Sequence, residues 1–145
     1  MEEILIQLAT AFLGSFGFSL VFGLRFRWVL HASLGGLCCW GIYLLANSRL
    51  HSIFAACLIA SAFAALYGEI LARLCKAPAT VFFVPSVIPL IPGGALYYTM
   101  SYAVQGDWAA ASHYGSLTMQ YALAIAAGIS LVWALGSMRT RLRRR

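Results

Sequence analysis

The chain has 145 residues and a net charge of +6, with 62% hydrophobic and only 10% charged residues. Soluble domains contain about 45–50% apolar and about 25% charged residues. The composition therefore excludes an ordinary soluble protein and indicates an integral membrane protein. We expect one transmembrane domain over residues 1–145, because this length leaves no room for a separate soluble domain.

Five apolar runs follow one another along the chain. Each is long enough to cross a bilayer as a helix, which takes about 20 residues. We expect an all-α integral membrane protein with about five transmembrane helices. Glu2 and Glu3 precede the first run, whereas a cleavable signal peptide begins with positive charge, so we expect this run to stay as a helix. The five runs cover residues 4–22, 28–46, 52–71, 80–104 and 116–137.

The basic residues predict the orientation of the chain, because cytoplasmic loops of membrane proteins are rich in Lys and Arg. With the first connection placed inside, nine of the ten Lys and Arg residues face the cytoplasm and only Arg49 faces out. The N-terminus is then outside and the C-terminus inside. The terminal RTRLRRR is interpreted as a cytoplasmic anchor against anionic lipid rather than as a nucleic-acid site.

Small residues recur at helical spacing in two of the runs. Ala56, Ala60 and Ala64 lie four residues apart in the third run, and Ala122 and Ala126 do so in the fifth. Residues at this spacing share one helix face, and membrane helices pack through such small residues. We interpret these alanines as packing faces.

Sequence signatures of catalysis are absent, since no HExxH, GxSxG or phosphate-loop pattern occurs. We therefore expect neither an enzyme nor a cofactor. The cysteines form no CxxC pair and lie in or beside apolar runs, which is typical of packing residues rather than metal ligands. They are Cys38, Cys39, Cys57 and Cys75.

The fourth run, which contains VPSVIPLIPGGALYYTM, is predicted to be a broken helix. Proline removes a backbone donor and interrupts helices, and Pro92 is suited to the first position of a new helix. The new helix would present free N–H groups and a positive dipole end, which suits a carboxylate. A kinked span shaped only by packing is the alternative. The predicted binding residues are Pro89, Pro92, Gly93, Gly94, Tyr97, Tyr98 and Thr99.

A second candidate group lies near the cytoplasmic end of the third run. Glu69 is a carboxylate inside an apolar segment, and such residues are functional candidates by default. Arg73 lies four residues on, so an i,i+4 ion pair on the helix surface is the simpler explanation. His31 begins the second run on the same side. We predict a coupling or gating role for Glu69, Arg73 and His31, and no metal site.

Three stretches of this chain resemble the threonine/serine exporter (ThrE) family, and more closely its small YjjB-like subunits. VFFVPSVIPLIPGGALYYTM at 81–100 resembles the family's signature stretch. GFSLVFGLRFRWVLHASLGGLCCWGIYLL at 17–45 is similar to its first cytoplasmic turn and second span, and ALYGEILARLCKAPATVF at 65–82 is similar to the lead into the proline motif.

The resemblance implies a function and a partner. Family members export small carboxylates, which are threonine and serine in some and succinate in others. Split forms pair a small five-span subunit with a larger membrane subunit that has a cytoplasmic N-terminal region. The resemblance thus implies the small subunit of a secondary exporter in a bacterial inner membrane. The alternatives are a structural or regulatory subunit that stabilises a transporting partner and, third, a holin-like pore.

Overall fold

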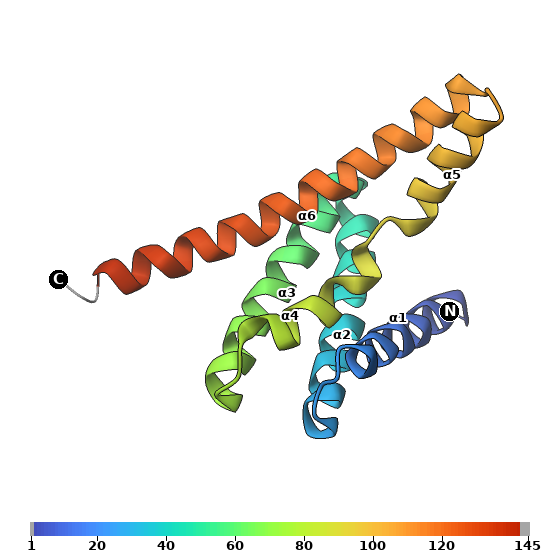
Figure 1. Cartoon of the computed structure of the whole chain (residues 1–145). Helices are drawn as coiled ribbons and strands as arrows, with labels where there is room; N and C mark the ends of the chain where they lie inside the picture. The colour runs from blue at the N-terminus through green and yellow to red at the C-terminus, as the bar shows by residue number, and fades with distance from the viewer. Residues whose placement is uncertain (1, 143–145) are drawn as a thin grey trace.

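The computed structural model describes residues 2–142, with side chains described as far as residue 138, and it contains helices but no strand in that range. Four long helices, two shorter helices and one 3-10 turn make up the described chain (Figure 1). They are α1 (Glu2–Val21), α2 (Phe26–Leu50), α3 (Ile53–Cys75), α4 (Ala79–Val87), the 3-10 turn η1 (Ile88–Leu90), α5 (Gly93–Val104) and α6 (Trp108–Leu142).

Four helices of the described chain, α1, α2, α3 and α6, are long and apolar enough to cross a membrane. The pair formed by residues 79–90 and 93–104 is bent by 52° and makes a fifth span if it counts as one. The predicted all-α membrane fold with a broken fourth span is therefore confirmed. The orientation of the termini stays a prediction.

The last helix begins eight residues before the predicted start of the fifth run. Asp107 caps it, because its carboxylate accepts a hydrogen bond of 3.1 Å from the Ala110 N–H. The following alanines are strong helix formers, so residues 108–115, which lie between the predicted fourth and fifth runs, are helical. At 35 residues α6 is about 52 Å long, more than the ~30 Å of a hydrocarbon core.

A left-handed residue ends four of the helices and turns the chain back. Gly23 and Gly106 adopt φ angles of 66° and 79°, which glycine does at little cost. His51 and Lys76 adopt 49° and 50°, and each donates its N–H to the last turn of the helix before it. Ser52 then caps α3, since its side chain accepts from Ala55 N. These caps explain why the connections are short.

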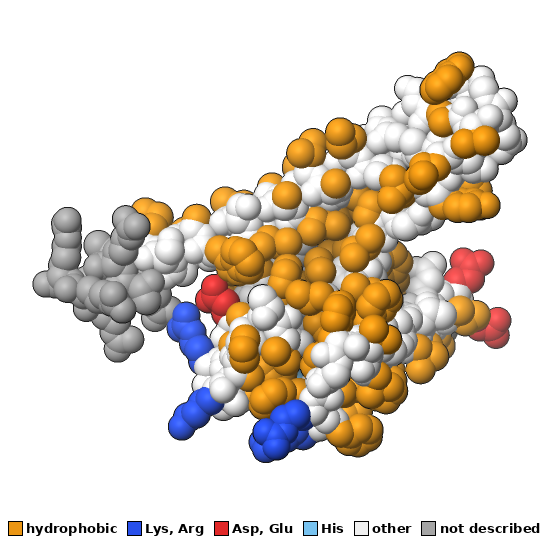
Figure 2. All heavy atoms as spheres, in the orientation of Figure 1, with side chains coloured by type: hydrophobic (Ala, Val, Ile, Leu, Met, Phe, Trp, Pro, Cys, Tyr) orange, Lys and Arg blue, Asp and Glu red, His pale blue; other side chains and the backbone are white. Residues whose placement is uncertain are grey.

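The helices form a compact group with one projecting hairpin. α2 packs against α1, α3 and α4, while α3 also packs against α4 and α6. α5 packs against the N-terminal half of α6, and the two extend away from the other helices (Figure 1). The α1–α2 and α3–α4 turns lie at the same end of the group. Basic side chains gather at that end in Figure 2, whereas acidic ones at the N-terminal end of α1 lie apart from it.

The core is built from small side chains. Ala56, Ala60 and Ala64 are fully buried, which confirms the packing face predicted for the third run. Ala122 and Ala126 are exposed, and α6 instead turns Ala124 and Gly128 inward. The buried cysteines Cys39 and Cys57 join the same core. Close approach of backbones, rather than large interlocking side chains, therefore holds α3 against its neighbours.

Two buried serine hydroxyls make polar contacts between helices. The Ser61 hydroxyl lies 3.0 Å from the Leu58 carbonyl in its own helix and 3.4 Å from the Ala124 carbonyl of α6. The Ser86 hydroxyl similarly lies 2.7 Å from the Phe82 carbonyl in α4 and 3.4 Å from the Ala32 carbonyl of α2. The Ser15 hydroxyl is the exception, because it has no hydrogen-bond partner within the described chain. The fully buried serines are Ser15, Ser19, Ser33, Ser61 and Ser86.

Candidate functional site

The break in the fourth span is made by two of its three prolines. Pro85 lies inside α4 without ending it, whereas Pro89 lies in η1 and Pro92 immediately precedes α5. Pro92 has φ −79° and ψ 55°, and the Gly93 N–H bonds the Ile91 carbonyl at 2.8 Å. This is an inverse γ-turn. The new helix thus begins at Gly93, one residue after Pro92, which was predicted to be its first residue.

The start of α5 is open. Leu96 N makes the first helical bond, to the Pro92 carbonyl at 3.0 Å. Within the described chain the Gly94 and Ala95 N–H groups have no backbone partner, as expected of a helix start. A Cβ built on Gly93 or Gly94 would meet nothing within 4 Å. These two glycines therefore leave space in front of two free donors, and the chain itself does not fill that space.

The three hydroxyl residues that follow are arranged differently from one another. Thr99 donates its proton to the Ala95 carbonyl at 2.7 Å, so it offers no donor at the start of the helix. Tyr98 packs against Tyr114 at a centroid distance of 5.2 Å in an aromatic cluster between α5 and α6. Tyr97 is 66% exposed and lies one turn after Gly93, on the same face. Of the three residues, Tyr97 is therefore the one whose hydroxyl lies on the same helix face as Gly93, the first residue of α5.

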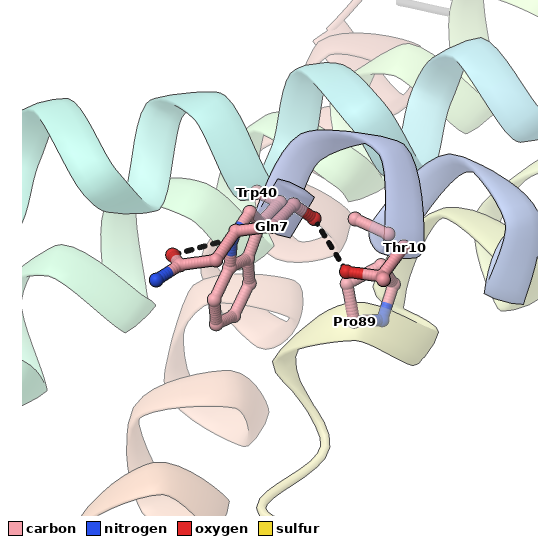
Figure 3. Close-up of a pocket in the computed structure, with 5 residues that line it drawn as sticks. Gln7, Thr10, Trp40 and Pro89 are labelled. Atoms are coloured by element: carbon pink, nitrogen blue, oxygen red, sulfur yellow. Dashed lines mark hydrogen bonds between the residues drawn. The ribbon is translucent and has the colours of Figure 1, made fainter. Parts of the chain in front are cut away.

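A groove runs beside the break, between α1, α2 and η1 (Figure 3). Its volume is about 270 Å³. The Trp40 indole N–H donates to the Gln7 side-chain oxygen at 3.4 Å, and the Thr10 hydroxyl bonds carbonyls of its own helix. We call it the α1–α2 groove, and it is lined by Gln7, Thr10, Ala11, Trp40 and Pro89.

Sequence reasoning predicted only Pro89 among these lining residues. A signal was available, because Gln7 is a lone amide in the first apolar run and Thr10 lies three residues on, on the same helix face. That these two residues face Trp40 and the break depends on how α1 packs against α2.

Glu69 and Arg73 form the predicted ion pair, with 3.4 Å between the guanidinium and the carboxylate. The Arg73 side chain is 70% exposed and that of Glu69 is 23% exposed. Gly136 of α6 faces the carboxylate, since a Cβ built there would lie 3.2 Å from Oε1. The pair lines a cavity of about 420 Å³ between α3 and α6. Glu69 thus belongs to a helix crossing, and the α1–α2 groove is a different cavity.

His31 is not paired with Glu69 in the described part of the chain. Its Nδ1 lies 2.8 Å from the Arg27 carbonyl, and because a carbonyl only accepts, Nδ1 carries the proton. The Tyr67 hydroxyl donates to the His31 backbone carbonyl at 2.7 Å. His31 therefore helps to join α2 to α3 through its backbone, at a distance from the ion pair.

Comparison with known proteins identifies the family. A family model described as "Threonine/Serine exporter, ThrE" matches residues 7–135, which include the break, the α1–α2 groove and the Glu69 pair. No curated protein and no solved structure matches the chain. Because the match covers most of the chain, the chain belongs to the threonine/serine exporter (ThrE) family, a family of membrane transporters.

Proposed function

We propose that this chain is a membrane subunit of a secondary exporter of small carboxylates, either threonine and serine or succinate. It acts with a larger homologous membrane subunit that carries a cytoplasmic N-terminal region. The single observation that carries the proposal is the open start of α5, where two free N–H groups stand behind two glycines at a break in a membrane span. The region lies within the residues that match the exporter family.

The substrate carboxylate binds at this open start. Free N–H groups and the positive end of the helix dipole favour an anion there. Transporters use discontinuous helices in this way near the middle of the bilayer. Tyr97 follows on the same face and adds a hydroxyl donor to the site. Pro89 and Pro92 hold the two helical pieces apart.

The membrane arrangement follows from the charges. The chain lies in the bacterial inner membrane with its N-terminus outside, so that the basic α1–α2 and α3–α4 turns face the cytoplasm. One half of the exporter rocks against the other to give alternating access. The Glu69–Arg73 pair at the α3–α6 crossing lies near the cytoplasmic side, where it serves in coupling or gating.

The test is efflux of labelled threonine, serine or succinate from a deletion strain that carries variants of the full chain. Gly93→Leu and Gly94→Leu place a side chain in front of the free donors. Neither glycine has a left-handed φ, and a Cβ at either position meets nothing, so the fold tolerates the change. Gly17→Leu is the matched control, because that glycine also faces open space but lies in α1.

We expect efflux to be lost in the Gly93 and Gly94 variants and kept in the Gly17 variant, with equal amounts of assembled complex in the membrane. Full efflux from the Gly93 and Gly94 variants would show that the substrate does not bind at the start of α5. Full efflux from cells that contain the larger subunit alone would show instead that this chain is a structural or regulatory subunit.

A further inference from the structure

The helices α3 and α6 separate toward their C-terminal ends (Figure 1). At Gly128 the α6 backbone lies against the α3 backbone, since a Cβ there would be 2.6 Å from the Leu58 carbonyl oxygen. About two turns later, at Gly136, the atoms that a Cβ would meet belong to the Glu69 side chain. The separation leaves a space of about 420 Å³ on the C-terminal side of the crossing. We call this space the α3–α6 cavity.

The walls of the α3–α6 cavity are aliphatic and uncovered. Leu66 and Ile70 line it from α3, and Val132 and Leu135 line it from α6. Leu66, Ile70 and Leu135 are at least half exposed. An unfilled space deprives the side chains around it of dispersion contacts. In a bilayer, an apolar group from outside the chain therefore fills the cavity.

The Glu69–Arg73 pair lies at the end of the cavity nearest the basic α1–α2 and α3–α4 turns. Arg73 is in the last turn of α3, and its one described hydrogen bond, to Glu69, measures 3.4 Å. A guanidinium has five N–H donors, so most of them stay available, and their planar arrangement suits a phosphate group. Lys76 follows three residues on. The cavity thus has a cationic donor at one end and aliphatic walls beyond it.

We propose that the α3–α6 cavity binds an anionic phospholipid from the leaflet next to the basic turns. The lipid phosphate accepts hydrogen bonds from Arg73, and one acyl chain runs along α3 from Arg73 to Leu66. These two residues lie about 10 Å apart along the helix axis. Basic pockets between membrane helices bind anionic head groups in this way. The order of groups in the cavity, cationic at the membrane surface and aliphatic toward its middle, matches the order of groups in such a lipid.

The size of the cavity favours a lipid chain over a helix of another protein. A helix is about 10 Å wide with its side chains, so a single turn of 5.4 Å occupies about 420 Å³. The cavity therefore holds one helical turn at most, although it extends over two turns of α3. A hydrocarbon chain is much narrower and follows the whole length. A soluble phosphate would bind Arg73 but leave the aliphatic walls uncovered.

The experiment measures lipid binding to the full chain in an uncharged detergent. Phosphatidylglycerol is titrated in, and the bound lipid is counted by native mass spectrometry. Phosphatidylcholine tests the charge, because it has the same tails without a net charge. Glycerol 3-phosphate tests the tails, because it has the phosphate without them. A phosphatidylglycerol with a photoreactive acyl chain then locates the site through the peptides that it labels.

Two variants address the two ends of the cavity. Arg73→Gln removes the guanidinium, and Arg27→Gln is its control, because Arg27 is also an exposed cation at this end of the molecule but does not line the cavity. Ile70→Trp fills the cavity with a larger side chain. Ile59→Trp is the matched control, because Ile59 is exposed on the same helix outside the cavity.

We expect the unaltered chain to bind phosphatidylglycerol more tightly than phosphatidylcholine and to be labelled around residues 66–70 and 132–135. Arg73→Gln weakens the binding about ten- to a hundredfold, the usual effect of a hydrogen bond to a charged group. Ile70→Trp abolishes the labelling, and both controls behave like the unaltered chain. If Arg73→Gln does not accumulate in the membrane, Ile70→Trp carries the test, because it leaves the guanidinium in place.

Equal binding of phosphatidylglycerol and phosphatidylcholine would overturn the lipid site, and so would unchanged labelling in Ile70→Trp. Displacement of the lipid by an equal concentration of glycerol 3-phosphate would show a site for a soluble phosphate instead. Loss of the labelling when the larger subunit is purified with the chain would assign the cavity to a protein interface. These outcomes do not depend on efflux in the Gly93 and Gly94 variants, so the lipid site and the proposed function are tested separately.

Discussion

The crossing of α3 and α6 allows one substitution to be worked out in detail, Gly128→Ala. A Cβ on Gly128 would lie 2.6 Å from the Leu58 carbonyl oxygen and 3.0 Å from the Ala62 nitrogen, and it would also meet the Ser61 hydroxyl. Two of these three atoms belong to the backbone. They move only if α3 moves as a whole, so the clash is not relieved by a side-chain rotation.

Overpacking of this kind costs about 1–3 kcal/mol, and contact with backbone atoms favours the upper part of that range. Replacing glycine by alanine inside a helix also stabilises the folded chain by about 1 kcal/mol, because alanine has the higher helix propensity. The expected net destabilisation is therefore about 1–2 kcal/mol. For a chain of this size that corresponds to a fall in melting temperature of about 2–8 °C.

A thiol-reactive dye measures the melting in detergent, because Cys39 and Cys57 are fully buried in the folded chain. The exposed Cys38 and the half-buried Cys75 are first changed to serine to remove their background signal. Gly17→Ala is the control, since a Cβ there meets nothing and only the propensity gain remains. If the Gly128→Ala variant melts at or above the melting temperature of this control, the close backbone contact of α3 and α6 at Gly128 is refuted.

Three further predictions use the same melting assay. Ser15→Ala removes a buried hydroxyl that has no partner among the described residues, so it is expected to raise stability by about 1 kcal/mol, and a clear loss would contradict this. Tyr121→Phe removes the bond to the Tyr43 hydroxyl and is expected to cost about 0.5–1.5 kcal/mol; an unchanged melting temperature would count against that contact. Glu69→Gln breaks a pair whose Arg73 partner is mostly exposed, so stability should change by less than about 0.5 kcal/mol. The same variant is expected to abolish the dependence of efflux on the proton gradient, and a retained dependence excludes Glu69 from coupling.

The sequence alone determined the class of the protein and its sequence of helices. Apolar runs of spanning length require helices in a bilayer, because each backbone polar group must find a partner within its own segment. The proline and glycine pattern around residues 85–94 likewise determined that the fourth span is broken, since proline cannot donate to a helix. The i,i+4 spacing was also enough to predict the ion pair of Glu69 and Arg73.

Only the tertiary structure decided which residues meet between helices. Sequence periodicity places Ala122 and Ala126 on one face of α6, but it does not say which face turns inward, and the chain turns Gly128 inward instead. The α1–α2 groove likewise depends on packing, because Gln7 and Trp40 are 33 residues apart and become neighbours only when α1 lies against α2. Local patterns determine each helix, whereas the rotation of a helix about its axis is chosen by the close approach of small residues on its neighbours.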